Sequence, residues 1–138
     1  MKPITGICVD GWCSGNPGPG GYRAVNIETG DILFEWEANL ITNNLAEFIG
    51  LYHAILWRDK YMPDATIWSD SNTAMAWVKH KKVNTTFNLN RSPAVKGRIK
   101  TCLDGLQLYK VGINFSYYNI QKWETKVWGE IPADLGRK

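Results

Sequence analysis

A change in the spacing of apolar residues near Thr42 constrains the fold of this chain more than any other feature. Over residues 32–39, apolar side chains alternate with mostly polar ones, which is typical of a β-strand with one buried face. Over residues 45–56, they recur every three or four positions, which predicts an amphipathic helix of about four turns. Thr42 and the two asparagines that follow it are candidate caps for this helix. The chain is therefore expected to combine strands and helices in an α/β fold.

The remaining elements continue this alternation. Short apolar runs at 4–9 and 65–68 predict two strands, which lead to Asp10 and Asp70. We further expect a loop at 11–21, a hairpin at 22–39, helices at 71–79 and 95–106, a strand at 113–117 and a helical turn at 132–135. This order predicts a mixed sheet in which the strands that end at Asp10 and Asp70 are parallel and joined by a right-handed crossover.

Length and composition narrow the class of protein. At this length, we expect residues 1–138 to form one domain. Three cysteines without CxxC or zinc-type spacing, together with two histidines, argue against a disulfide scaffold or a structural zinc site. The net charge of +3 permits a polyanionic partner without requiring one. No apolar run approaches the roughly 18 residues of a membrane span, and the start lacks the apolar core of a secretory signal, so we expect a cytoplasmic protein.

Four acids occupy positions from which they can meet. In an open α/β sheet, the functional crevice lies beyond the carboxyl ends of the parallel strands, where Asp10 and Asp70 are expected. Glu47 belongs to the first turn of the long helix, and Asp134 to the terminal helical turn. Crowded carboxylates repel one another unless a cation neutralises them, and ligands that are all oxygen favour Mg²⁺ or Mn²⁺. A lone acid at such a position is more often a cap or turn residue, so the pattern alone leaves both interpretations open.

Three segments resemble the signature segments of ribonuclease H, type I. They are Val9-Asp10-Gly11 with Cys13 and residues 15–21, then Thr42-Asn43-Asn44-Leu45-Ala46-Glu47, and then Ser69-Asp70-Ser71. Their spacing, the element order and the length agree with the family over essentially the whole chain. The resemblance implies a five-stranded mixed sheet of order 3-2-1-4-5 with flanking helices. It also implies endonucleolytic cutting of the RNA strand of an RNA–DNA hybrid, which leaves 3′-hydroxyl and 5′-phosphate ends.

The resemblance further implies roles for individual acids. By position, Asp10, Glu47 and Asp70 would be catalytic metal ligands, with Asp10 bridging two Mg²⁺ ions that Mn²⁺ can replace. Asp134 would be the last acid of the set, within a surrounding motif that differs from the family's usual one. Two ions about 4 Å apart can activate a water and stabilise the leaving oxygen of a phosphodiester. The resemblance also suggests a monomer.

The same resemblance implies contacts to the hybrid. Gly11, Cys13 and Asn16 would lie along the RNA strand. Thr42 would contact a DNA phosphate, Asn43 would contact the minor groove, and Asn72 would be a further contact. Telling RNA from DNA requires contacts to the 2′-hydroxyl, which both donates and accepts hydrogen bonds. Each of these residues can instead be a plain turn or capping residue.

Two segments depart from the family pattern. Between Ser71 and Leu103 there is no acid, but there are seven basic residues, namely Lys79, Lys81, Lys82, Arg91, Lys96, Arg98 and Lys100. This segment is a candidate surface for a nucleic-acid backbone, with a solvated basic helix end as the alternative. The Trp-rich basic protrusion that many members carry here is reduced to Trp77 and Phe87.

The second departure is the loss of the histidine that the family usually carries in a loop shortly before the last acid. Here residues 121–126 contain no histidine, and Glu124 is near its place. Glu124 either helps to bind an ion or move a proton, or it is a surface glutamate. We expect cleavage to survive this change, because the family's chemistry rests on the metal-bound carboxylates.

Three functions are compatible with these features. The first is a metal-dependent endoribonuclease that acts on RNA–DNA hybrids, and the second is a non-catalytic or weakly active hybrid-binding module of the same fold. The third is a nuclease of this fold with another substrate. The intact Asp10, Glu47 and Asp70 favour an enzyme, because a binding module gains little from three buried acids. The matches at Cys13–Asn16 and Thr42–Asn43 favour hybrids over duplex DNA.

Overall fold

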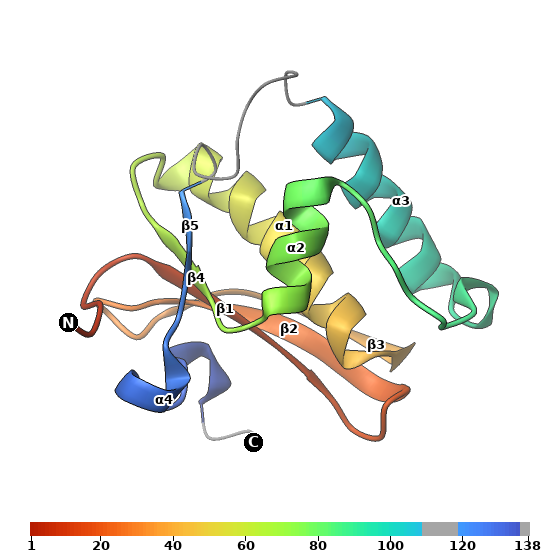
Figure 1. The fold of residues 1–138 in the computed structure, drawn as a ribbon, viewed down its shortest axis with the longest axis horizontal. Helices are drawn as coiled ribbons and strands as arrows, with labels where there is room; N and C mark the ends of the chain where they lie inside the picture. The colour runs from red at the N-terminus through yellow and green to blue at the C-terminus, as the bar shows by residue number, and fades with distance from the viewer. Residues whose placement is uncertain (109–118, 136–138) are drawn as a thin grey trace.

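A five-stranded mixed sheet forms the centre of the computed structural model, which describes residues 1–108 and 119–135 (Figure 1). The strands are β1 (Ile7–Cys13), β2 (Gly18–Asn26), β3 (Ile32–Ile41), β4 (Ile67–Ser69) and β5 (Ile120–Lys122). Their order is β3-β2-β1-β4-β5, with β1, β2 and β3 antiparallel in turn and β1, β4 and β5 parallel. The expected strand order and the parallel pairing of the two strands that lead to Asp10 and Asp70 are confirmed.

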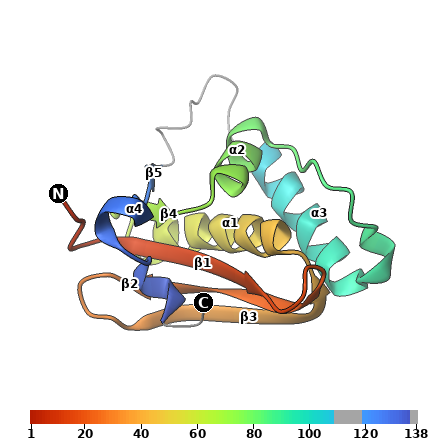
Figure 2. The same ribbon diagram turned by 60° about the horizontal axis from the view of Figure 1, so that its bottom comes forward.

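Helices cover the sheet on one side, and the C-terminal segment covers part of the other. The helices are α1 (Asn43–Tyr61), α2 (Asn72–His80), α3 (Pro93–Gln107) and α4 (Thr125–Trp128), with short 3₁₀ helices η1 (Leu89–Arg91) and η3 (Pro132–Asp134). Figures 1 and 2 show α1, α2 and α3 together on one side, with α4 away from them. Among the described residues, no helix combines the length and the apolar content that crossing a membrane requires.

Strand β1 contributes to two separate clusters of buried side chains. Ile7 and Val9 belong to the larger cluster under α1, α2 and α3, whereas Cys8 belongs to a smaller one that includes Trp123. Successive side chains of a strand point to opposite faces of the sheet, so β1 packs against both buried clusters. Asp10 follows the same alternation and shares the face of Cys8.

The glycine-rich segment after Asp10 is mostly strand, so the prediction of a loop over 11–21 is wrong. β1 continues to Cys13 and β2 begins at Gly18, which makes Asp10 an internal strand residue rather than the last one. A Cβ atom added to Gly20 would lie 2.4 Å from the Trp12 carbonyl oxygen, and one added to Gly21 would lie 2.0 Å from that of Trp36. These glycines therefore allow neighbouring strands to approach closely and do not form a turn.

The C-terminal part also differs from the sequence-based expectation. The strand predicted at 113–117 lies outside the described residues, and β5 is found at Ile120–Lys122. Helix α4 was not predicted, because four residues are too few to establish a helical period. The buried Trp123 indole donates a hydrogen bond of 2.9 Å to the Gly129 carbonyl and meets the Trp128 ring edge to face. The helical turn expected at 132–135 is confirmed as η3.

We expect two Gly→Ala substitutions to have opposite effects on stability. Gly21→Ala should lower the free energy of unfolding by about 2 kcal/mol or more, because the new methyl group has no room beside β3. Gly97→Ala should raise it by about 0.5–1 kcal/mol, because Gly97 lies inside α3 with open space around it. Urea unfolding of both variants measures the difference. A stabilised Gly21→Ala protein would contradict the tight β2–β3 packing.

Candidate active site

The sheet brings Asp10 and Asp70 to neighbouring positions. Val9 and Ser69 are partners in the parallel pairing of β1 with β4, and each is followed directly by one of these acids. Neighbouring strands lie about 4.8 Å apart, so the two carboxylates are close at the end of β4. The structure therefore shows the register of β1 against β4, which the sequence alone does not determine.

Helix α1 adds Glu47 to the same place. Thr42 caps this helix, because its hydroxyl oxygen accepts a hydrogen bond of 3.2 Å from the Leu45 N–H. A Cβ atom on Gly11 would lie 2.8 Å from the Glu47 backbone nitrogen, so glycine at this position lets the helix approach β1. The Gly11 N–H donates a hydrogen bond of 2.9 Å to Oε1 of Glu47 and fixes that side chain. Gly11 thus positions an acid in addition to any contact with a substrate.

The three acids form one cluster. Asp10, Glu47 and Asp70 each offer an oxygen atom, and these atoms lie within 4.8 Å of one another. Asp10 and Glu47 are 4% and 3% exposed, whereas Asp70 is half-buried and leaves the cluster open on one side. The convergence expected from the sequence is therefore present for three of the four acids.

Repulsion within the cluster affects Glu47 most clearly. Burial, and then the charges of Asp10 and Asp70, raise the pKa of Glu47 well above its ordinary value. Its Oε2 atom is buried and receives no hydrogen bond from the described residues. A cation would satisfy this oxygen and remove the repulsion. The donor set is all oxygen, which suits a hard divalent cation such as Mg²⁺ or Mn²⁺.

The other two acids with predicted roles have different surroundings. Asp134 is 3% exposed in η3, which packs on β1 and β2, but it is not among the three acids that gather within 4.8 Å. Glu124 is exposed at the start of α4, where its carbonyl oxygen accepts a hydrogen bond of 2.8 Å from the Trp128 N–H. The structure gives Asp134 a buried position beside β1 and Glu124 a surface position.

Lys122 is a neighbour of the cluster that sequence reasoning missed. It ends β5, opposite Ser69 in the parallel pairing with β4, and its ammonium group donates a hydrogen bond to the backbone carbonyl of Asp70. No local motif marks this residue, because the contact depends on two strands pairing across 52 positions of chain.

The residues with predicted hybrid contacts lie in β1, in the β1–β2 turn and at the starts of α1 and α2. The Asn16 side-chain oxygen accepts a hydrogen bond of 2.9 Å from the Asn43 N–H, which ties the β1–β2 turn to the start of α1. The half-buried Cys13 thiol donates to the Ile41 carbonyl at 3.1 Å. Asn72 is exposed at the first position of α2. These contacts give Asn16 and Cys13 structural roles, and their contacts with a substrate stay predictions.

A groove of about 540 Å³ begins at this turn. Asn16 and Thr42 lie at one side of it, and the loop between α2 and η1 forms another side. The remaining residues that line it are Pro17, Asn44, Trp77, Asn84, Thr85, Thr86, Phe87, Asn88 and Arg91. Of the described residues that line the groove, Arg91 alone is charged, and the others are mainly amides, hydroxyls and aromatic rings. Much of this lining comes from the asparagine- and threonine-rich loop between α2 and η1.

The basic segment between Ser71 and Leu103 does not form one uniform surface. Arg91 reaches the groove, whereas Lys100 pairs with Asp104 at 2.6 Å on the exposed side of α3. Arg98 turns inward and lies 4.1 Å from the centroid of the Trp36 ring. Charge counting along the sequence therefore overestimates the number of cations that face a nucleic acid together.

Comparison with known proteins gives concordant matches. The profile of the RNase H family matches residues 3–118. The chain is similar to RNase H1 from the halophilic archaeon Halobacterium salinarum NRC-1, with 22% identity, a TM-score of 0.50, and coverage of 88% of this chain and 86% of that one. At this identity, the likeness shows a shared fold.

Two further structures are similar at lower TM-scores. The N-terminal RNase H domain of a Mycobacterium tuberculosis protein has 23% identity and a TM-score of 0.49, with 87% of this chain and 81% of that one covered. LC11-RNase H1 in complex with an RNA/DNA hybrid has 25% identity and a TM-score of 0.45, with 85% and 81% covered.

We expect Glu47→Gln to stabilise the metal-free protein at neutral pH. A carboxyl group whose pKa is raised by folding favours the folded state fully when protonated, and this contribution is lost as pH rises through the raised value. In EDTA at pH 7, the variant should therefore unfold at least a few degrees above the wild type, and the difference should shrink toward pH 4. Glutamine keeps an oxygen that can accept the Gly11 N–H.

Thermal unfolding between pH 4 and pH 8 measures this effect, with the exposed Glu130→Gln as the matched control. Added Mg²⁺ should raise the midpoint of the wild type more than that of Glu47→Gln. A difference between the two proteins that does not depend on pH would contradict the assigned repulsion.

Proposed function

The chain belongs to the RNase H family, and from this premise we propose that it is a metal-dependent endoribonuclease that hydrolyses the RNA strand of RNA–DNA hybrids. The observation that carries the proposal is the cluster of Asp10, Glu47 and Asp70, whose oxygens lie within 4.8 Å of one another. Two buried acids and a half-buried one this close together weaken a fold unless a cation neutralises them. Their position at the open end of the parallel strands matches the usual place of an α/β active site.

The proposed cofactor is a pair of Mg²⁺ ions, for which Mn²⁺ can substitute. When bound, such ions lower the pKa of an attacking water and stabilise negative charge on the leaving 3′-oxygen. Asp10, Glu47 and Asp70 would hold them, with Asp10 shared between the two. The water adds to phosphorus while the bond from phosphorus to the 3′-oxygen breaks, so the products are a 5′-phosphate and a 3′-hydroxyl.

The chain's own groups supply position and charge. The Gly11 N–H holds Oε1 of Glu47, which leaves Oε2 for the metal. The Lys122 ammonium group is anchored on the Asp70 carbonyl and adds a positive charge at the border of the cluster. We propose that Asp134, buried in η3 against β1 and β2, is the fourth acid of the metal site. A part for Glu124 in proton transfer stays a prediction.

We propose that the hybrid lies across the acid cluster and the neighbouring groove. Gly11, Cys13 and Asn16 would follow the RNA strand, while Thr42, Asn43 and Asn72 would contact the DNA strand or the groove between the strands. The lining of the groove supports this arrangement, because amides and hydroxyls donate hydrogen bonds to phosphate oxygens and aromatic rings pack on sugars or bases. The expectations of a monomer and of a cytoplasmic location stay predictions.

The alternative is a hybrid-binding module of the same fold that has lost cutting. It is favoured by one observation, the exposed Glu124 in the place where the family usually has a histidine. The intact cluster of three acids favours the enzyme, since binding alone does not require it.

Hybrid cleavage tests the proposal. The protein is incubated with a labelled RNA–DNA hybrid, duplex DNA or duplex RNA, in Mg²⁺, Mn²⁺ or EDTA. We expect the hybrid alone to be cut, only with metal, and Asp10→Asn to reduce the rate at least 100-fold because the shared ligand loses its charge. Asp64→Asn, an exposed acid of the α1–β4 connection, is the control and should cut at the wild-type rate.

Each other result has a defined meaning. Binding of the hybrid without cutting in either metal would support the binding module. Cutting of duplex DNA at the same rate as the hybrid would show that the substrate class is wrong.

The groove generates a second expectation, about salt. Because its lining holds one cation, Arg91→Met should weaken binding of a catalytically inert hybrid about tenfold and lower the slope of log affinity against log salt by about one. Lys60→Met removes the same charge near the far end of α1 and should change neither. Fluorescence anisotropy between 50 and about 300 mM salt measures both quantities. An unchanged slope for Arg91→Met would place the nucleic acid outside this groove.

A further inference from the structure

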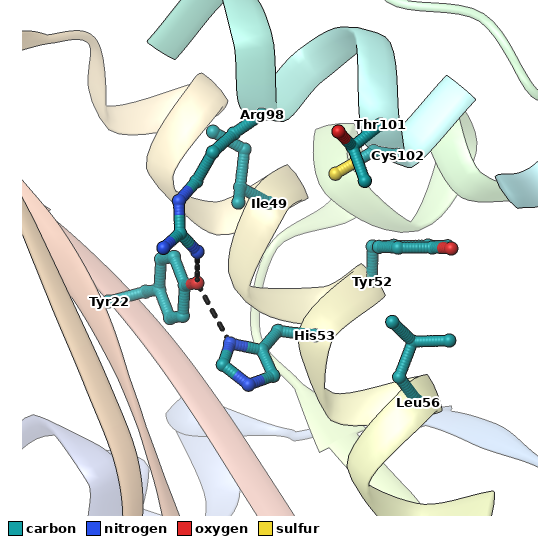
Figure 3. A pocket seen from close by; sticks show the side chains of 8 residues that line it. All are labelled: Tyr22, Ile49, Tyr52, His53, Leu56, Arg98, Thr101 and Cys102. Carbon is teal, nitrogen blue, oxygen red and sulfur yellow. Dashed lines mark hydrogen bonds between the residues drawn. The ribbon is translucent and has the colours of Figure 1, made fainter. Parts of the chain in front are cut away.

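A separate cavity of about 300 Å³ lies between β2, α1 and α3 (Figure 3). None of the acids of the metal cluster lines it. Figure 3 shows side chains from α1 and α3 converging on it, with Tyr22 of β2 at one wall. Its volume is in the range of cavities that hold small organic molecules. The proposed nuclease function leaves this cavity without a role.

Helix α3 contributes a positive charge, that of Arg98, to the wall of the cavity. Among the described residues, no carboxylate lies within 4.0 Å of the half-buried Arg98 guanidinium group. The guanidinium group instead lies over the Trp36 ring and donates a hydrogen bond of 2.9 Å to the Tyr22 hydroxyl oxygen. These two contacts fix its position but do not neutralise it. A half-buried guanidinium group of this kind is a ready partner for a carboxylate, which it can bind through two parallel hydrogen bonds.

The hydrogen-bond chain continues from Tyr22 to His53. The Tyr22 hydroxyl oxygen and Nδ1 of His53 lie 2.8 Å apart. Burial raises the pKa of Tyr22 to about 12, so its hydroxyl keeps its proton. Burial, and then the charge of Arg98, lower the pKa of His53, so the imidazole is neutral at pH 7. The Tyr22 hydroxyl oxygen accepts from Arg98 and also shares the hydrogen bond with Nδ1 of His53, so these contacts hold all three side chains in the cavity wall.

The rest of the lining is largely apolar, with Ile49, Leu56, Cys102 and the Tyr52 ring beside the Thr101 hydroxyl. A Cβ atom on Gly105 would lie 1.7 Å from the Tyr52 hydroxyl, so glycine at this position lets the Tyr52 side chain lie against α3. Leu56 lines the cavity and is 47% exposed, so it lies where the cavity meets the solvent. The cavity thus combines apolar walls with one charged donor, the usual composition of a small-molecule site.

We propose that this cavity binds a small organic monocarboxylate, with its carboxylate on Arg98 and its apolar body against Tyr52 and Leu56. One guanidinium group balances one negative charge, so a monoanion leaves no net charge in the half-buried site, whereas a phosphate dianion would. The cavity volume limits the body of the ligand to about the size of an aromatic ring with a short chain.

Phenylacetate is a suitable probe because it joins an aromatic ring to a carboxylate by one methylene group. Titration of the ¹⁵N-labelled full chain, followed by NMR, should shift the backbone amides of Thr101 and Cys102, which line the cavity. A ligand of this size is expected to bind with a dissociation constant on the order of 1 mM or tighter. Phenylacetamide, which has the same shape without the charge, should bind at least about tenfold more weakly.

Two variants separate the charge from the shape of the cavity. Arg98→Met keeps an unbranched apolar side chain and should weaken phenylacetate at least about tenfold. Leu56→Trp changes an exposed position that lines the cavity, and the larger side chain should also weaken phenylacetate binding by filling the cavity. Lys96→Met removes an exposed cation from the same helix outside the cavity and should leave the affinity unchanged.

The comparison of ligands on the wild type keeps the test valid even if a variant folds poorly. Equal affinity of phenylacetamide and phenylacetate would overturn the role of Arg98. Tighter binding of phenyl phosphate than of phenylacetate would overturn the monocarboxylate class. Amide shifts confined to residues away from the cavity, or no shifts at all, would overturn the site. None of these results depends on whether the protein cuts a hybrid.

Discussion

Mutual repulsion among Asp10, Glu47 and Asp70 is the interaction that the remainder of the fold must oppose. Each acid belongs to a different element, so the cluster forms only when β1, β4 and α1 are all in register. The hydrogen bond from the Gly11 N–H to Glu47 offsets part of this repulsion directly. In the metal-free protein, the packing of the sheet must supply the rest of the stabilising free energy that offsets this repulsion. A bound divalent cation would attract all three carboxylates and so stabilise the same arrangement.

The sheet can oppose this repulsion because its elements approach closely. Glycines at 11, 20 and 21 allow α1 and β3 to lie nearer to β1 and β2 than a Cβ atom would permit. β1 also belongs to both buried clusters, so displacing it would expose apolar side chains on two faces. The strand that carries Asp10 is therefore among the most firmly held parts of the chain, as precise placement of a metal ligand requires.

The sequence predicted the fold through signals that are local. Alternation at 32–39, the helical spacing at 45–56 and the acids after two apolar runs each lie within a few residues, and the structure agrees with all of them. The misjudged segments depend on contacts between distant residues. Gly20 and Gly21 look like turn residues until β3 is placed beside them, and the approach of Lys122 to Asp70 requires the pairing of β4 with β5. The groove and the Arg98 cavity have no sequence motif, because three or more elements form each of them.

The central claim is that the three acids form one divalent-metal site. An anomalous difference map from crystals soaked in Mn²⁺ tests it most directly, because the map locates the ion without reference to activity. We predict a peak bounded by the carboxylates of Asp10, Glu47 and Asp70. A peak at other carboxylates, or no peak among these three at an occupancy that saturates the crystal, would contradict the claim.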